Sequence, residues 1–200
     1  MNKIIAVTIG DIEGIGIEIL IKIFKSRKNN KFVLFTNYKI FKSYLLNKKI
    51  NINIKLANNS LSKLEKLDYF NFINVYDFKS KTKIENTYNS LIESYKLTKL
   101  KYFIGVLTLP VNKELIIKNI DRNFIGQTEF YQRIDKKRSV NMLFIHKNLR
   151  ILTLTTHIEF KKILHHLNKK NYIYDKIFSI NKIFKKDLNI SSPKMIIAGI

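Results

Sequence analysis

Several residue types that carry chemistry or shape are scarce in this chain. None of its 200 residues is a cysteine, which excludes disulfides, thiolate metal sites and cysteine nucleophiles. No uninterrupted apolar stretch approaches the roughly 18 residues that span a bilayer. Met1–Ile9 also lacks the small-residue cleavage site of a signal peptide. We therefore expect a cytoplasmic protein with no membrane partner.

Arginine is the scarce member of an otherwise abundant basic set. The formal net charge is +22, a value that can indicate nucleic-acid binding, but it comes from 32 Lys and only 5 Arg. Arg is the residue preferred for bidentate contacts with phosphates and bases. Ile, Asn and Lys together make up 88 residues, and all three have A/T-rich codons. Codon bias therefore explains the charge better than nucleic-acid binding does, which stays the third-ranked interpretation.

Hydrophobic residues make up 46% of the chain, enough for a packed core, and they fall in short runs between helical patterns. Continuous apolar strands that alternate with helices predict an α/β fold with a mostly parallel sheet and helices on both faces. Ile50–Leu56 alternates in polarity and is expected near a sheet edge. The other predicted strands are Lys3–Ile9, Lys31–Thr36, Phe72–Phe78, Tyr102–Leu109, Val140–Ile145, Arg150–Thr155 and Lys194–Ile200. The predicted helices are Ile17–Lys25, Tyr38–Asn47, Glu85–Lys101, Glu114–Asn119, Thr128–Ile134, Ile158–Leu167 and Tyr172–Phe184.

The organisation of the chain shows no internal repeat and no linker. The predicted strand Lys194–Ile200 runs directly into the C-terminus. A core strand usually continues into a loop and a covering helix. We therefore interpret residues 1–200 as the N-terminal portion of a larger α/β protein that stops mid-domain at Ile200.

Glycines punctuate the turn after the first predicted strand, in the segment GDIEGIGIE. Gly10, Gly14 and Gly16 permit positive φ and a close approach of the backbone to another chain segment or to a ligand. Their spacing differs from the dinucleotide-binding fingerprint. The segment, which includes Asp11, is either a structural turn or a ligand loop, and spacing alone leaves both interpretations open.

The segment LTLPVNKE begins within the predicted strand Tyr102–Leu109, which delivers Asn112 and Lys113 to its carboxyl end. Ligands of open α/β sheets bind at that edge, so Lys113 could pair with a phosphate or a carboxylate. The alternative is a solvated lysine at the start of a helix.

The segment GQTEF places Gln127 and Thr128 at the start of a predicted helix. Free backbone N–H groups and a hydroxyl at this position suit an anionic group. Either residue could instead be a simple helix cap.

Four histidines occur, at positions 146, 157, 165 and 166. His157 follows the predicted strand Arg150–Thr155 and is placed to bind a metal or a substrate, but one histidine does not make a metal site. His165 and His166 are adjacent on a predicted helix and point about 100° apart, so they do not form a pair. His146 falls in a turn.

These motifs occur in the order and spacing of one enzyme family. The chain resembles the 4-hydroxythreonine-4-phosphate dehydrogenases in IAVTIGDIEGIGIEI, TLPVNKELI, FIGQTEF, NMLFIHKNLRILTLTTHIEFKKI and PKMIIAGI. The first and fourth segments are the most specific, and together the five span nearly the whole chain. The resemblance implies a two-lobed fold like that of isocitrate and isopropylmalate dehydrogenases.

The resemblance also implies an activity. Members oxidise 4-phosphooxy-L-threonine with NAD, and the keto acid formed then decarboxylates, as a step of vitamin B6 synthesis. They act as homodimers and hold a divalent metal (zinc, magnesium or cobalt) with three histidines. His157 matches the first of these ligands, Thr128 matches a substrate-contacting threonine, and Lys113 matches the lysine of its motif.

The chain departs from the family pattern at several positions. Gln127 stands where the family has a substrate-contacting histidine, and Ile12 and Ile17 replace two prolines. The resemblance places the second and third metal histidines beyond Ile200, so we expect the 200 residues alone to be inactive. A truncated or decayed non-catalytic relative is the alternative interpretation.

Overall fold

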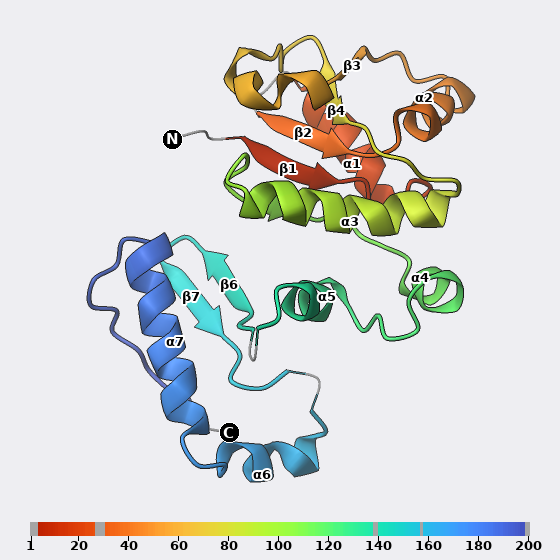
Figure 1. Cartoon of the computed structure of the whole chain (residues 1–200). Coiled ribbons are helices and arrows are strands. Elements are labelled where there is room, and N and C mark those ends of the chain that lie inside the picture. Colours follow the sequence, from red (N-terminus) through yellow and green to blue (C-terminus); the bar gives the residue numbers. More distant parts are fainter. Residues whose placement is uncertain (1–3, 27–30, 138–139, 157, 199–200) are drawn as a thin grey trace. The chain divides into compact units, whose positions relative to one another are not determined.

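The computed structural model describes residues 4–26, 31–137, 140–156 and 158–198. The chain divides into two compact units, Met1–Lys136 and Lys137–Ile200, which we describe separately (Figure 1). Within the described segments, no helix is both long and apolar enough to cross a membrane.

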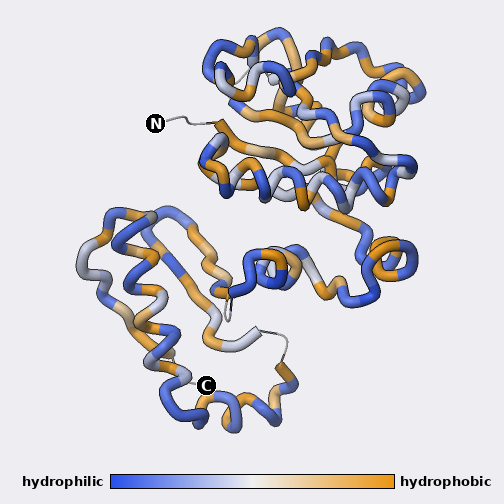
Figure 2. The backbone as a smooth tube through the Cα atoms, in the orientation of Figure 1, coloured by the Kyte–Doolittle hydropathy of each residue, from blue (hydrophilic) through white to orange (hydrophobic). Residues whose placement is uncertain are grey.

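The first unit is built on a five-stranded parallel sheet with the strand order β3-β4-β2-β1-β5. β1 and β2 lie at its centre, with Ile5 opposite Phe32 and Thr8 opposite Phe35. Figure 2 shows these central strands as largely hydrophobic. The strands are β1 (Ile5–Thr8), β2 (Phe32–Phe35), β3 (Ile54–Leu56), β4 (Ile73–Tyr76) and β5 (Val106–Leu107). The parallel sheet and the edge position of the Ile50–Leu56 region are confirmed.

Helices cover both faces of this sheet, as predicted, and α3 runs alongside β1, below the strands in Figure 1. Phe32 and Leu34 of β2 pack in one core with α1 and α2, whereas Val33 and Phe35 pack with the other face. This alternation of side chains is what a strand buried on both faces requires. The covering helices are α1 (Ile15–Lys25), α2 (Tyr38–Asn47), the 3-10 segment η1 (Asn58–Lys66) and α3 (Lys83–Lys99).

Two short helices follow the sheet, α4 (Lys113–Asn119) and α5 (Gln127–Ile134). They pack on α3 through a third core made of Leu91, Ile116, Phe124 and Phe130. These four side chains are at most 2% exposed. The third core therefore fixes both helices to the same element that covers the sheet.

A buried amide joins the ends of two central elements. Asn86 of α3 is fully buried; its Oδ1 accepts the Asn37 N–H at 2.6 Å, and its Nδ2 donates to Thr36 Oγ1 at 2.9 Å. Thr36 and Asn37 lie between β2 and α2, so Asn86 satisfies polar groups that would otherwise be buried without a partner.

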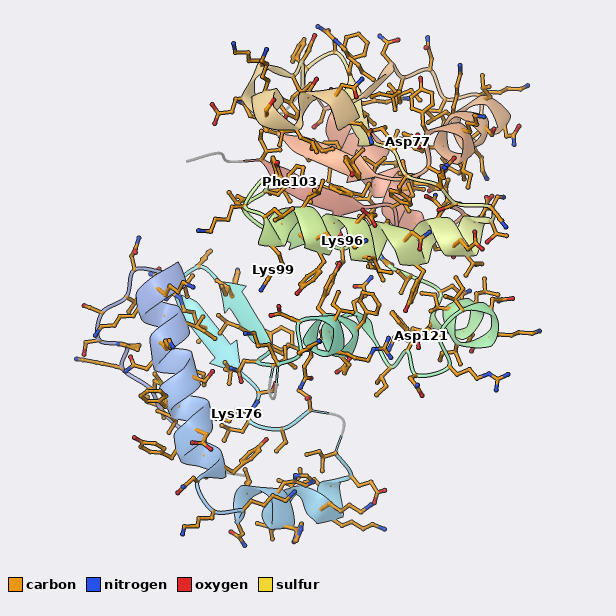
Figure 3. The ribbon with its side chains drawn as sticks, in the orientation of Figure 1. Asp77, Lys96, Lys99, Phe103, Asp121 and Lys176 are labelled. Atoms are coloured by element: carbon orange, nitrogen blue, oxygen red, sulfur yellow. The ribbon has the colours of Figure 1, made fainter. Side chains whose placement is uncertain are left out.

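The second unit contains an antiparallel hairpin of β6 (Leu143–His146) and β7 (Leu149–Leu152). The segment η2 (Phe160–Lys162), α6 (Ile163–Leu167) and α7 (Tyr172–Asp187) follow it. Lys176 of α7 donates to Val140 O at 3.1 Å and to Asn141 Oδ1 at 2.9 Å, and burial lowers its pKa (Figure 3). This lysine ties α7 to the start of the hairpin.

The structure corrects three predicted strands. Of Tyr102–Leu109, only Val106–Leu107 is a strand, and Ile104 and Leu107 are exposed. Arg150–Thr155 contributes to an antiparallel hairpin and not to the parallel sheet, so the region before His157 is not the end of a parallel strand. Residues 194–198 form no strand, and Ile196 is 96% exposed, because no neighbouring strand within the described residues supplies backbone partners.

We expect Asn86→Ala to destabilise the chain by about 1–3 kcal/mol, because it leaves the Asn37 N–H and the Thr36 hydroxyl without their main partner. Urea denaturation followed by circular dichroism measures the change. The control is Asn89→Ala on the same helix, where the half-buried amide makes only 3.3 Å contacts. Equal losses in both variants would contradict the role given to Asn86.

Candidate functional site

The glycine-rich turn between β1 and α1 lies directly on the segment that follows β5. The Asp11 N–H donates to Pro110 O at 2.8 Å, and the Leu109 N–H donates to Thr8 Oγ1 at 3.2 Å. The Thr87 hydroxyl of α3 donates to Gly10 O at 2.6 Å from the other side. Segments that are about 100 residues apart in sequence are thereby joined at the carboxyl edge of the sheet, where α/β proteins bind ligands.

Two glycines of this turn are required by the close approach of Leu109 and Pro110. A Cβ added to Gly10 would lie 2.5 Å from Pro110 O, and Gly10 also has a φ of +64°. A Cβ added to Gly16 would lie 2.8 Å from Pro110 Cδ and 3.1 Å from Leu109 Cβ. Chain packing thus accounts for these glycines without a ligand. The carboxylate of Asp11 also has a local role, because its Oδ1 accepts the Glu13 N–H at 3.1 Å.

Gln127 and Lys113 meet the same segment from α5 and α4. Gln127 Nε2 donates to Leu109 O at 2.8 Å. Lys113 is exposed at the first position of α4, and its Nζ would be 3.7 Å from a Cβ added to Gly126. The structure therefore gathers the glycine turn, Lys113 and Gln127 around Leu109 and Pro110.

A polar cluster holds these two helices in place. Asp121, which follows α4, pairs with Arg133 of α5 and accepts the Tyr88 hydroxyl of α3 at 3.0 Å (Figure 3). The hydrogen bond from Arg133 lowers the pKa of the Asp121 carboxyl. The ionised Asp121 carboxylate therefore stabilises the fold fully at neutral pH, and this stabilisation is lost as the pH falls through the lowered pKa of Asp121.

The gathered groups suit an anionic ligand. Lys113 supplies a mobile positive charge, and Thr128 supplies a half-buried hydroxyl in the first turn of α5. Gly126 is the N-cap of α5 and makes no side-chain cap hydrogen bond, and the Glu129 carboxylate lies beside it, with Oε2 2.8 Å from a Cβ added to Gly126. A phosphate or carboxylate is the kind of group that such donors hold.

The described residues do not supply a complete set of metal ligands. They contain no group of three His, Cys, Asp or Glu side chains that could hold an ion. The predicted ligand His157 lies outside the described residues. The His165 and His166 rings of α6 are 6.1 Å apart and inclined by 87°, and exposed His146 ends β6.

Sequence reasoning missed the residues that assemble this region. The roles of Thr8, Thr87 and Asp121 depend on contacts with residues 12 to 101 positions away. No local pattern marks such contacts. Pro110 was the available signal, because it directly follows the predicted strand Tyr102–Leu109 within the LTLPVNKE motif.

Comparison with known proteins adds to this geometry. Residues 28–200 match the family described as pyridoxal phosphate biosynthetic protein PdxA. The chain belongs to the PdxA family. The match covers most of the sequence and includes the segments that contain Lys113, Gln127 and Thr128.

Curated relatives of the PdxA chain are named dehydrogenases. The 4-hydroxythreonine-4-phosphate dehydrogenases of Sulfurihydrogenibium sp. and Aquifex aeolicus are 27% and 30% identical, over 98% and 92% of this chain. A Clostridium botulinum relative, 26% identical, has the provisional name D-threonate 4-phosphate dehydrogenase. The chain spans 62%, 58% and 63% of the lengths of these three relatives.

A solved structure of 4-hydroxythreonine-4-phosphate dehydrogenase from Klebsiella pneumoniae has the same fold. The TM-score is 0.76 at 20% identity, over 92% of this chain and 60% of that one. The similarity confirms the predicted α/β fold.

In this PdxA chain we expect Gly16→Ala to cost about 1–3 kcal/mol of stability, because the added Cβ overlaps Pro110 and Leu109. Thermal unfolding followed by circular dichroism measures the loss. The matched control is Gly105→Ala, where an added Cβ meets nothing within 4 Å. A Gly16 variant as stable as the Gly105 variant would show that this close approach does not constrain the turn.

Proposed function

We propose that this chain is part of an NAD-dependent enzyme that oxidises 4-phosphooxy-L-threonine, whose product then decarboxylates, in pyridoxal 5'-phosphate synthesis. The observation that carries the proposal is the PdxA family match over residues 28–200. The names of the relatives from Sulfurihydrogenibium and Aquifex support the same substrate. We further propose a cytoplasmic homodimer as the working form.

In this proposal the gathered polar groups bind the substrate. Lys113 is the single cation of the group and would pair with the phosphate or the carboxylate of the substrate. Thr128 would donate its hydroxyl to the same anion. Gln127 already donates to Leu109 O, which orients its amide and leaves its Oε1 to accept a substrate hydroxyl or amine.

A divalent metal (zinc, magnesium or cobalt) and NAD belong to the proposal as cofactors. When bound, the metal would polarise the oxygens of the substrate. His157 is its proposed ligand in this chain. Within the described residues the donor set for this metal is incomplete.

We expect the 200-residue chain to bind 4-phosphooxy-L-threonine but to form no NADH. Three of the proposed substrate-contacting groups lie within it, whereas only one proposed metal ligand does. Binding is followed by the amide NMR shifts of residues near Lys113 and Thr128, and turnover by NADH absorbance with NAD and added Mg²⁺ or Zn²⁺. Metal-dependent NADH formation by these 200 residues would contradict this division of the site.

Lys113→Ala should weaken the binding of the substrate by roughly tenfold, the usual effect of losing a charge-assisted contact. The matched control is Lys118→Ala, which removes an exposed charge from the same helix α4. Equal effects of both changes would assign the loss to overall charge and not to Lys113. No binding at all would favour a decayed relative. Tighter binding of D-threonate 4-phosphate would instead favour the activity named for the Clostridium relative.

A further inference from the structure

A second feature of the first unit is a cavity of about 460 Å³ at the carboxyl edge of the parallel sheet. The residues that line each wall come directly after a parallel strand in the sequence. Glu13 comes after β1, the helix α2 comes after β2, and the residues Lys81 and Lys83 come after β4. We call this cavity the basic pocket. Its lining is Glu13, Lys39, Ile40, Ser43, Tyr44, Asn47, Lys48, Lys81 and Lys83.

The basic pocket lies where the connections of the sheet change faces. β2 and β4 are neighbours, but the helix α2 after β2 packs in the core on one face of the sheet. The helix α3 after β4 contributes Leu97 to the core on the other face. The helices therefore diverge from the ends of adjacent strands, and this is the topological switch point at which open α/β sheets bind ligands.

The walls of the pocket combine an apolar side with a cationic rim. Ile40 is half-buried and Tyr44 is 6% exposed, while Ser43 and Asn47 add a hydroxyl and an amide. Four of the nine lining residues are lysines, against 32 of the 200 residues in the chain. The composition of the chain alone therefore does not account for this concentration of positive charge.

Most of this positive charge is not neutralised within the pocket. Lys83 pairs with Glu13 at 2.5 Å, a contact that lowers the pKa of the Glu13 carboxyl. Lys39, Lys48 and Lys81 form no ion pair with a carboxylate among the residues that the structure describes.

Burial raises the pKa of the lining residue Tyr44, and the nearby Glu18 and Glu13 carboxylates raise it further. Two other carboxylates near the pocket are engaged with backbone. Asp77 accepts the Tyr38 N–H at 2.7 Å at the start of α2 (Figure 3). Glu85 accepts the Lys81 N–H at 2.7 Å at the start of α3. Neither side chain lines the cavity. The lining therefore contains four positive charges and one negative charge.

We propose that the basic pocket binds a small molecule with two or more phosphate groups. Lysines act as separate point charges and suit tetrahedral phosphates, whereas planar bidentate recognition of carboxylates needs arginine, which this pocket lacks. The cavity volume lies within the range of small-molecule sites. The lysines surround a concavity, whereas the basic residues of a nucleic-acid-binding surface form an extended stripe. The proposal does not depend on the activity proposed above.

The test uses pyrophosphate as the probe and the 200-residue chain, by isothermal titration calorimetry at low and at physiological ionic strength. We expect saturable binding at both, with shifts of the Ser43 and Asn47 amides in NMR spectra. The double variant Lys48→Ala/Lys81→Ala should weaken binding by at least about tenfold. The matched control is Lys63→Ala/Lys66→Ala, which removes two exposed lysines of η1 outside the pocket.

Glu13→Gln provides a change in the opposite direction. It removes the only acidic residue of the lining and frees Lys83, so binding of pyrophosphate should tighten by a few-fold. An equal loss of binding in the control variant would assign the effect to the charge of the whole surface and overturn the proposal. Absence of saturable binding, or no tightening with Glu13→Gln, would also overturn it.

Discussion

The contact of the Gly10–Gly16 turn with Leu109 and Pro110 is the constraint on which the rest of the first unit depends. It joins the ends of β1 and β5, and these strands share only the two register pairs Ala6–Val106 and Val7–Leu107. Backbone hydrogen bonds from Ala6 N–H to Gly105 O and from Ile104 N–H to Ile4 O join the two segments before β5, and those from Asp11 and Leu109 join them after it. Side chains at Gly10 or Gly16 would separate the two segments, so the glycines serve the packing of the chain itself.

That same contact positions the polar groups of the candidate site. Gln127 reaches Leu109 O only because α5 is fixed on α3 by Phe130, Ile116 and Leu91 and by the pairing of Asp121 with Arg133. An apolar core and a polar cluster thus act together on two helices of eight residues or fewer. Helices this short are not stable by themselves in water, so their positions follow from packing.

Structure that depends on interactions between residues close in the sequence could be predicted from the sequence. Structure that depends on contacts between distant segments could not. The helix predicted near Tyr38–Asn47 is present as α2, because the Asn37 side chain caps it and its apolar positions repeat with helical spacing. The segment Tyr102–Leu109 is as apolar as a central strand, yet its strand is confined to Val106–Leu107, at the edge of the sheet where β1 is the one neighbour. Residues 194–198 show the same dependence, since hydrophobicity makes a strand only where another strand provides hydrogen-bond partners.

The motif residues Lys113 and Gln127 were found from spacing, but the contacts that gather them, through Thr8, Thr87 and Asp121, have no signature in the sequence.

The abundance of lysine has a further consequence for how sites can be found in this chain. Because the chain has 32 lysines, the presence of a lysine in a sequence motif says little about whether it binds a ligand. The position of that lysine in the fold is the better evidence. Lys113 lies at the start of the helix that follows the β5 end, whereas Lys39, Lys48 and Lys81 come from segments after β2 and β4 that converge on one cavity. Exposed lysines elsewhere, such as Lys63 and Lys66, have the same charge but line no such cavity. A lysine-rich composition therefore hides phosphate sites from sequence patterns without removing them, because the topology of the sheet decides which charges meet.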